Sequence, residues 1–367
     1  MIKSCATPEA TGEYAGRFAE LPGNYRRVLG VSVSSIGIGT YLGESDESTD
    51  AAYEQALRSA LQRGINLIDT AVNYRLQRSE RVIGKVIAEL VEAGDIKREE
   101  IVVATKGGYI PFDSDAADPR AWFEAKLVRP GIVGPGDVIQ GSHCMTPRYL
   151  DAMIETSREN LGLETIDIYY LHNPESQLAA LGRAEFRDRI RRAFEFLEVA
   201  VNEGRINYYG AATWNGFRVP ANDNSYLSLA ELLATAEEVS GEDHHFRVIQ
   251  LPYNLGMPEA LTLANQTLPD ASKVSTLAAA DTSGIAVCAS ASLLQGRLTR
   301  GLPELLAEAM AGLESDAQRS IQFVRSTPGV DVALVGMSSV AHVEHNLRTA
   351  QQPPAPFESL MKLFQRS

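Results

Sequence analysis

Hydrophobic and polar positions along the chain follow two alternating spacings. Short apolar or β-branched runs, typical of buried strands, alternate with stretches in which apolar residues recur every three or four positions, typical of helices. The predicted strands lie at residues 35–40, 66–71, 101–105, 166–171, 206–212, 246–251, 285–289 and 330–335. The predicted helical stretches lie at residues 51–63, 79–93, 147–161, 187–202, 227–239, 261–281, 303–311, 316–325 and 340–350.

Several predicted helices have recognisable ends. Thr146 followed by Pro147 is typical of an N-cap with proline at the first helical position, and Gly162 is a typical residue at which a helix stops. Eight strands alternating with helices favour a (β/α)8 barrel over a doubly wound sheet. In addition, no G-x-G-x-x-G motif follows the first strand, as a dinucleotide-binding doubly wound domain would require.

Three segments fall outside this alternation. Residues 107–145 separate the third strand from its helix by far more than the usual 2–6 residues, and their aromatic residues and prolines indicate an ordered insertion. Residues 1–24 precede the pattern and residues 351–367 follow it as a tail. We therefore predict a single-domain barrel over residues 25–350, although 367 residues would allow about two domains.

The charge and the cysteine content exclude several classes of protein. A formal charge of −13 without a long basic run disfavours nucleic acids and anionic membrane surfaces as partners. Three widely spaced cysteines indicate neither a disulfide framework nor a thiolate zinc site, which fits a reducing, cytoplasmic setting. Residues 1–24 lack the apolar region of a secretory signal, and no apolar run approaches the ~20 residues that span a bilayer.

Four polar residues are expected at one end of such a barrel. Asp69, Lys106 and His172 end the second, third and fourth strands, and Tyr74 lies in the loop after the second. Reactive groups of this fold sit where the strands end. Each residue alone has an ordinary explanation: a helix cap or ion pair, a solvated charge, a structural histidine, or a packed aromatic ring. Their coincidence on successive strand ends favours an active site.

The chemistry of these four side chains suggests proton transfer. A free tyrosine has a pKa near ~10, and a nearby ammonium favours its phenolate form. Asp69 would hold Lys106 near Tyr74, and His172 would polarise or orient a carbonyl oxygen. The six histidines contain no H-x-H pair at a strand end, so we expect no catalytic metal.

Four motifs of the chain resemble the aldo-keto reductase superfamily. They are GINLIDTA at residues 64–71 with Tyr74 five residues after Asp69, ATK at 104–106, IDIYYLHNP at 166–174 and GRINYYG at 204–210. The resemblance extends over about residues 25–347. It implies a (β/α)8 barrel that binds a nicotinamide dinucleotide without a doubly wound domain.

The resemblance also implies a role for each of the four residues. Tyr74 would donate the proton to the carbonyl oxygen, and Lys106, paired with Asp69, would lower the pKa of Tyr74. His172 would orient the carbonyl and assist the proton transfer.

The resemblance further implies contacts with the cofactor. The positions matching cofactor-binding residues are Gly39, Thr40, Tyr41, Asp69, Thr213, Gln250, Leu293, Gln295, Gly296, Gly336, Met337, Ser338, Ser339, His342, His345 and Asn346. Ala212 and Ser290 depart from the family, which usually has serine and a stacking tyrosine there. Gly336 and His342 stand where NADP-selecting members usually carry a lysine or arginine. The family nevertheless favours NADP(H) over NAD(H).

The function expected from these features is an NAD(P)-dependent oxidoreductase that interconverts an aldehyde or ketone, such as a sugar or small carbonyl, and its alcohol. A cofactor-binding regulatory or sensor protein and a non-redox lyase or isomerase on the same barrel remain alternatives. Candidates for the substrate mouth, each also explicable by packing, are Tyr41, Tyr109, Trp122, His143 and Trp214. Neither the substrate nor the oligomeric state is predicted.

Overall fold

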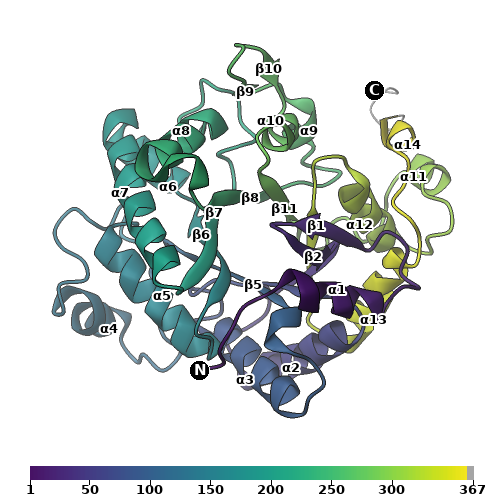
Figure 1. The fold of residues 1–367 in the computed structure, drawn as a ribbon, viewed down its shortest axis with the longest axis horizontal. Coiled ribbons are helices and arrows are strands. Elements are labelled where there is room, and N and C mark those ends of the chain that lie inside the picture. The colour runs from purple at the N-terminus through teal and green to yellow at the C-terminus, as the bar shows by residue number, and fades with distance from the viewer. Residues whose placement is uncertain (362–367) are drawn as a thin grey trace.

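Eight parallel strands close into a barrel in the computed structural model, which describes residues 1–361 (Figure 1). Around the barrel the strands are β3 (Ile36–Gly39), β4 (Leu67–Asp69), β5 (Val102–Gly107), β6 (Ile166–His172), β7 (Ile206–Ala212), β8 (Phe246–Pro252), β11 (Ala286–Ser290) and β12 (Val332–Gly336). Each coincides with a strand predicted from the sequence. The predicted (β/α)8 fold class is therefore confirmed.

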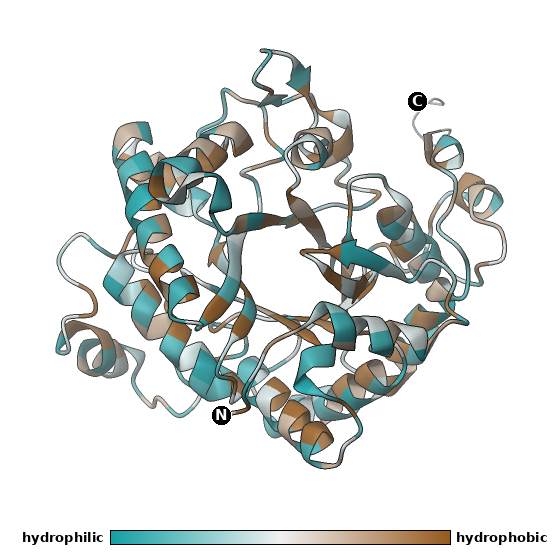
Figure 2. Cartoon of the chain, viewed as in Figure 1, coloured by the Kyte–Doolittle hydropathy of each residue, from teal (hydrophilic) through white to brown (hydrophobic). Residues whose placement is uncertain are grey.

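Helices surround the barrel and turn their apolar faces toward the strands (Figure 2). The helices that match the predicted stretches are α2 (Glu47–Gln62), α3 (Arg78–Glu92), α5 (Pro147–Leu161), α7 (Arg183–Asn202), α8 (Leu229–Ser240), α11 (Glu304–Ala309), α12 (Asp316–Ser326) and α13 (Val340–Ala350). The expected stop at Gly162 is present, in the left-handed conformation that glycine adopts at low cost.

An N-terminal helix and hairpin, not expected from the periodicity, cover one end of the barrel. Helix α1 (Pro8–Gly16) precedes a hairpin of β1 (Tyr25–Val28) and β2 (Val31–Ser34), coloured dark purple in Figure 1. Val28 and Val33 of the hairpin belong to the same apolar cluster as residues inside the barrel. The buried hydroxyl of Tyr14 donates to the main-chain oxygen of Leu61, which ties α1 to α2. The opposite end, where the parallel strands finish, is left for the active site.

The expectation that residues 261–281 are mostly helical is wrong. Only the short helices α9 (Glu259–Thr262) and α10 (Thr276–Thr282) form there, and a small hairpin of β9 (Gln266–Thr267) and β10 (Lys273–Val274) lies between them. The Asp270 carboxylate accepts hydrogen bonds from the main chain and the side chain of Ser272. Such a local turn competes with the helix at this point.

The insertion after β5 is ordered, and it packs against the outside of the barrel beside α5. It contains helix α4 (Pro119–Phe123), seen at the lower left of Figure 1, followed by one turn of π-helix over Glu124–Val128. Leu127 and Val133 of the insertion form an apolar cluster with Tyr149 and Met153 of α5. This packing explains why so long a segment keeps one conformation.

Two further short helices lie outside the predicted pattern. Helix α6 (Glu175–Leu181) follows β6 directly, and α14 (Phe357–Met361) forms in the predicted tail, whose residues 362–367 lie outside the described part. Within residues 1–361, no helix combines the length and apolar character that crossing a bilayer would require.

Candidate active site

The carboxyl ends of the barrel strands bring the predicted catalytic residues to one rim. Asp69 is the last residue of β4, and its strand partners are Gly39 on β3 and Ala104 on β5. His172 is the last residue of β6 and pairs with Ala212 of β7. Parallel strands in register therefore place these side chains at the same level of the barrel.

Lys106 connects two members of the set. Its Nζ donates to Asp69 Oδ2 and to the main-chain oxygen of Thr70, each at 2.7 Å, and lies 3.4 Å from the hydroxyl of Tyr74. Lys106 is only 1% exposed. Although burial opposes its charge, the neighbouring Asp69 raises the pKa of Lys106 above its usual value. The lysine is therefore charged and points at the tyrosine.

Tyr74 keeps its proton at neutral pH. Burial raises the pKa of Tyr74 above its usual value, and the charge of Lys106 opposes that effect without outweighing it. The lowering expected from the family's chemistry is thus present, but it is smaller than the desolvation that opposes it. The Tyr74 and His172 rings meet edge to face, with their centroids 5.8 Å apart. The Tyr74 hydroxyl is therefore protonated and lies beside both Lys106 and His172.

His172 is neutral and has one free ring nitrogen inside the protein. Burial, assisted by the charge of Lys106, lowers the pKa of His172 well below its usual value. Its Nδ1 is buried and has no hydrogen-bond partner. Because Nδ1 is buried within the protein and the residue lines the cavity, Nε2 is the nitrogen that can meet a ligand oxygen.

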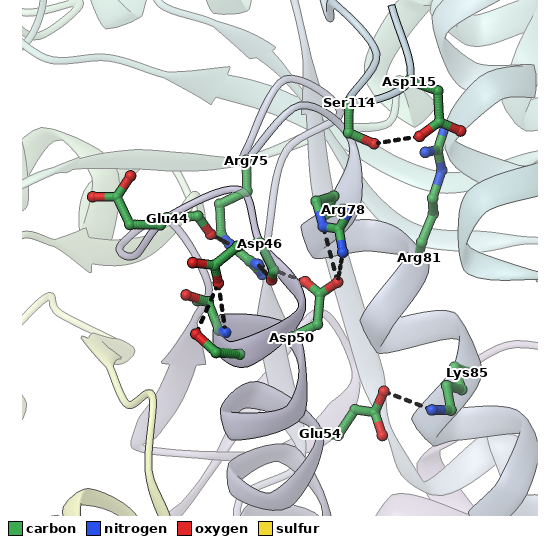
Figure 3. A network of polar contacts seen from close by, with 12 residues as sticks. Glu44, Asp46, Asp50, Glu54, Arg75, Arg78, Arg81, Lys85, Ser114 and Asp115 are labelled. Atoms are coloured by element: carbon green, nitrogen blue, oxygen red, sulfur yellow. Dashed lines mark hydrogen bonds and ion pairs between the residues drawn. The ribbon is translucent and has the colours of Figure 1, made fainter.

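The turn after Tyr74 has an unusual backbone. Arg75, Leu76 and Gln77 all have positive φ angles, of 48°, 55° and 70°, in a region that residues with side chains rarely occupy. The Arg75 guanidinium holds this turn: it donates to the main-chain oxygens of Glu44 and Asp46 (Figure 3).

The same network continues through a carboxylate of α2. Asp50 accepts from both Arg75 and Arg78, so the loop after β3 and the turn after β4 are joined (Figure 3). The loop after β3 also carries Tyr41, whose ring centroid lies 5.0 Å from that of Tyr74, so the network joins the two segments that bear these rings.

A cavity of about 1020 Å³ begins at this cluster and extends along the rim to α13. Its size lies at the upper end for small-molecule sites. Most residues predicted to contact cofactor or substrate line it: Gly39, Thr40, Tyr41, Asp69, Tyr74, Tyr109, His172, Thr213, Trp214, Gln250, Leu293, Gln295, Gly296, Gly336, Ser338, His342, His345 and Asn346.

Five predicted site residues do not line the cavity. Lys106 lies behind Asp69 and Tyr74. Met337 is buried, and Ser339 caps α13 by accepting from the main-chain N–H of His342.

The other two lie in the insertion, outside the cavity. Trp122, on α4, packs against Phe112, and His143 is buried beneath Tyr109. Neither residue is therefore placed to touch a substrate in the cavity.

Sequence reasoning missed several lining residues. Asn73 and Asn173 are the sequence neighbours of Tyr74 and His172. This adjacency could have identified them as lining residues from the sequence. Ser315 and Ala317, at the start of α12, precede the eighth strand. No local signal marks them, because only the closure of the barrel brings this helix to the rim.

The residues present fit a dinucleotide at its nicotinamide end. Gln250 Nε2 donates to Asp69 Oδ1 at 2.7 Å, which leaves its amide oxygen as an acceptor for a carboxamide. The hydroxyl of Thr213 is buried, lines the cavity and has no hydrogen-bond partner. Polar atoms in such a state call for a ligand.

The far end of the cavity contains histidines and serines. Ser315 Oγ lies 3.1 Å from Nε2 of His345, and Arg348 pairs with Glu314 outside the lining. Among the described lining residues there is no lysine or arginine. No group of three or more His, Cys, Asp or Glu side chains within residues 1–361 is arranged to hold a metal ion.

Comparison with known proteins places this geometry in context. The model of the Aldo/keto reductase family matches residues 35–358. Aldo-keto reductase YhdN of Bacillus subtilis is 28% identical over 183 residues, which are 48% of this chain and 45% of the relative. A putative voltage-gated potassium channel subunit beta of Schizosaccharomyces pombe is 26% identical over 191 residues, or 52% and 44%. The chain thus spans less than half the length of these curated relatives.

Solved structures share the fold at low sequence identity. Glycerol dehydrogenase AKR11B4 from Gluconobacter oxydans has a TM-score of 0.64 at 20% identity, covering 93% of both chains. An aldo/keto reductase from Klebsiella pneumoniae in complex with NADP and acetate has a TM-score of 0.62 at 21% identity, covering 94% of this chain and 98% of that one. At such identities the likeness concerns the architecture.

Proposed function

The chain belongs to the aldo/keto reductase family, and on that premise we propose that it interconverts an aldehyde or ketone and its alcohol, using a nicotinamide dinucleotide. The observation that carries the proposal is the Lys106 Nζ, which contacts both the Asp69 carboxylate and the Tyr74 hydroxyl from behind these two cavity-lining residues. If the Asp69–Lys106 ion pair served only stability, it would not need the protonated Tyr74 hydroxyl beside it.

Proton transfer is the part of the reaction that the chain's own residues perform. Tyr74 donates its phenolic proton to the carbonyl oxygen, and the charge of Lys106 stabilises the phenolate as it forms. Asp69 holds Lys106 in place, and neutral His172 orients the carbonyl through Nε2. A bound reduced nicotinamide supplies the hydride. In the reverse direction the phenolate accepts the proton of the alcohol.

We infer that the cofactor is NADP(H) rather than NAD(H). Structures of the same fold from Klebsiella pneumoniae are described with NADP and with NADPH. In this chain, Ser338 and His342 lie at the far end of the cavity, where hydroxyl and imidazole groups are hydrogen-bonding partners for a phosphate.

The lining supports a small uncharged carbonyl as substrate. Tyr41, Leu42 and Trp214 line the cavity and are 58%, 41% and 41% exposed, so its mouth is apolar and accessible. Among the described lining residues, Asp69 is the only Asp, Glu, Lys or Arg.

We further propose a reducing, cytoplasmic setting without nucleic-acid partners. The described cysteines are all free, and the chain carries a formal charge of −13.

The test combines binding and turnover. Purified protein is titrated with NADPH while nicotinamide fluorescence is recorded, and a panel of aldehydes, sugars and secondary alcohols is then assayed with both nucleotides. We expect saturable NADPH binding and turnover of uncharged carbonyls. Tyr74→Phe should bind NADPH normally and lose turnover by about 10²–10⁴-fold.

Three other outcomes contradict the proposal, each differently. The absence of a fluorescence change would show that the protein does not bind NADPH. Saturable binding without turnover of any carbonyl would favour a sensor or regulatory protein. Turnover with unchanged nicotinamide absorbance would favour a lyase or isomerase.

A further inference from the structure

The two ends of the insertion come together directly above His172. Ile110 donates from its main chain to Ser142, and Cys144 donates to Gly108, at 2.9 and 2.8 Å. Tyr109 and His143 face each other across this short antiparallel stem. The stem starts immediately after β5, so a segment that lies mainly outside the barrel has its base at the catalytic rim.

His143 makes two hydrogen bonds that agree on one tautomer. Its Nε2 lies 2.6 Å from the main-chain oxygen of His172, and its Nδ1 lies 3.0 Å from the Gln177 amide nitrogen. A carbonyl only accepts and an amide nitrogen only donates, so Nε2 carries the proton. The ring is 2% exposed, and burial lowers the pKa of His143 to about 4. The imidazole is therefore neutral, and each of its two nitrogens has a hydrogen-bond partner.

Glycine is needed where the stem leaves the barrel. A Cβ atom on Gly108 would lie 2.7 Å from the main-chain oxygen of His172 and 2.8 Å from Nε2 of His143. Both distances are shorter than any normal contact between a carbon atom and an oxygen or nitrogen atom. Gly108 thus leaves open the narrow space through which His143 reaches the last residue of β6.

His172 lacks the contact that usually fixes a catalytic histidine. Its Nδ1 has no partner that would set the ring orientation. The ring is instead flanked by Tyr74 and by Tyr109, whose centroid is 5.0 Å away in an edge-to-face contact. Tyr109 is held in turn, since Asn173 Nδ2 donates to its hydroxyl at 3.1 Å. The insertion therefore supplies both the ring beside His172 and the bond to its backbone.

We propose that His143 is a positioning residue for the reaction: by binding the main-chain oxygen of His172 it holds that imidazole at the cavity, and the insertion acts on catalysis through this stem. The inference rests on the proposed reductase function. It assigns His143 a role outside the cavity, without contact with substrate or cofactor.

Two substitutions separate the hydrogen bonds from the packing. His143→Phe keeps a flat ring and removes both hydrogen bonds, whereas His143→Gln keeps an N–H donor. Because misplacing a catalytic group by about 1 Å costs up to about 10²-fold, we expect kcat to fall by roughly tenfold or more in His143→Phe. NADPH affinity should change by less than about twofold, and His143→Gln should recover most of kcat.

A control and a second measurement complete the test. Trp122→Phe alters the same insertion away from the stem and should leave kcat unchanged. In ¹⁵N-histidine NMR of the full chain, the His172 ring signals should coincide in wild type and Trp122→Phe, and should shift or broaden by exchange in His143→Phe.

Any of three results would overturn the inference. His143→Phe could keep the wild-type kcat, or it could lose no more kcat than Trp122→Phe does. Its His172 NMR signal could also be unchanged. If wild type itself reduces no carbonyl, the proposed function fails, and the NMR comparison still decides whether His143 positions His172.

Discussion

At the scale of single residues, the site depends on charges held without water. Lys106 is buried against Asp69, and its charge counteracts the rise that burial causes in the pKa of Tyr74. A solvated lysine would be screened and would affect the phenol far less. The proposed proton transfer therefore depends on one buried ion pair behind the lining of the cavity.

Removing that charge should reduce both stability and turnover. Lys106→Met leaves Asp69 buried without its cation, which costs about 3–5 kcal/mol in the free energy of unfolding. The pKa of Tyr74 should rise further. The limb over which kcat of alcohol oxidation increases with pH should therefore move to higher pH. Urea unfolding and pH profiles of kcat measure the two effects.

A surface lysine provides the matched control. Lys85 pairs with Glu54 at 2.6 Å on exposed helix faces, so Lys85→Met should cost about 0–1 kcal/mol and leave the pH profile unchanged. Similar pH profiles for wild type and Lys106→Met would remove Lys106 from the proton-transfer argument.

Because His143 is buried in its neutral form, the free energy of unfolding should decrease in mild acid. An unfolded histidine has a pKa of about 6.5, and burial lowers the pKa of folded His143 to about 4, so the unfolded chain binds the extra proton first. This contribution is complete above pH 6.5 and is lost as the pH falls toward 4. Wild type should lose about 2 kcal/mol more than His143→Gln between pH 7 and pH 5.

Urea unfolding of both proteins at the two pH values measures this difference. The groups around the ring are His172, Tyr109 and Gln177, with Lys106 as the nearby charge felt by His172, and all are common to both proteins. An equal pH dependence in wild type and variant would show that His143 titrates normally.

At the scale of elements, a carboxylate of α6 orders the loop after β7. Glu175 Oε1 accepts from the main-chain N–H groups of Trp214, Asn215 and Gly216. Burial raises the pKa of Glu175, and these three donors oppose that rise. Because Thr213 and Trp214 line the cavity, the shape of its wall depends on α6, the helix that follows His172.

Glu175→Ala should therefore weaken cofactor and substrate binding. It leaves three main-chain donors without their acceptor, at a cost of about 1–3 kcal/mol for those that stay buried. We expect a roughly tenfold higher Kd for NADPH if about 1.4 kcal/mol of that cost appears in binding. Fluorescence titration measures it, with Glu195→Ala, an exposed partner of Arg191, as the control. Unchanged affinity would mean that the loop holds its shape without Glu175.

At the scale of the whole molecule, the cavity joins distant parts of the chain. Its lining extends from Gly39 at the end of β3 to Asn346 on α13. A ligand bound there stabilises the folded state by an amount that rises with its concentration over Kd. The segment boundaries at residues 25 and 350 remain predictions.

Cofactor preference should appear as a difference in stability. At 100 times its Kd, NADPH should raise the free energy of unfolding by about 2.7 kcal/mol, and NADH at the same concentration should raise it by less. Urea unfolding with each nucleotide measures this. Equal stabilisation by both would contradict the inferred NADP(H) preference, and no stabilisation by either would contradict the site.

The sequence by itself determined the order of the barrel elements and the four catalytic candidates. Strands buried on both faces are visible as apolar runs, and Asp69, Lys106 and His172 lie at their ends or one residue before. In a closed parallel barrel those ends must share a rim. Periodicity is a local property, so it could predict this much without any knowledge of packing.

Only the tertiary structure decided which other residues serve the site. The sequence predicted His143 at the substrate mouth and gave Glu175 no role, whereas in the structure each side chain bonds main-chain atoms of a distant segment. The direction of the Tyr74 pKa likewise depends on how much water the fold removes. Burial and long-range hydrogen bonds belong to the packed chain as a whole, because no short stretch of sequence specifies what will lie against it.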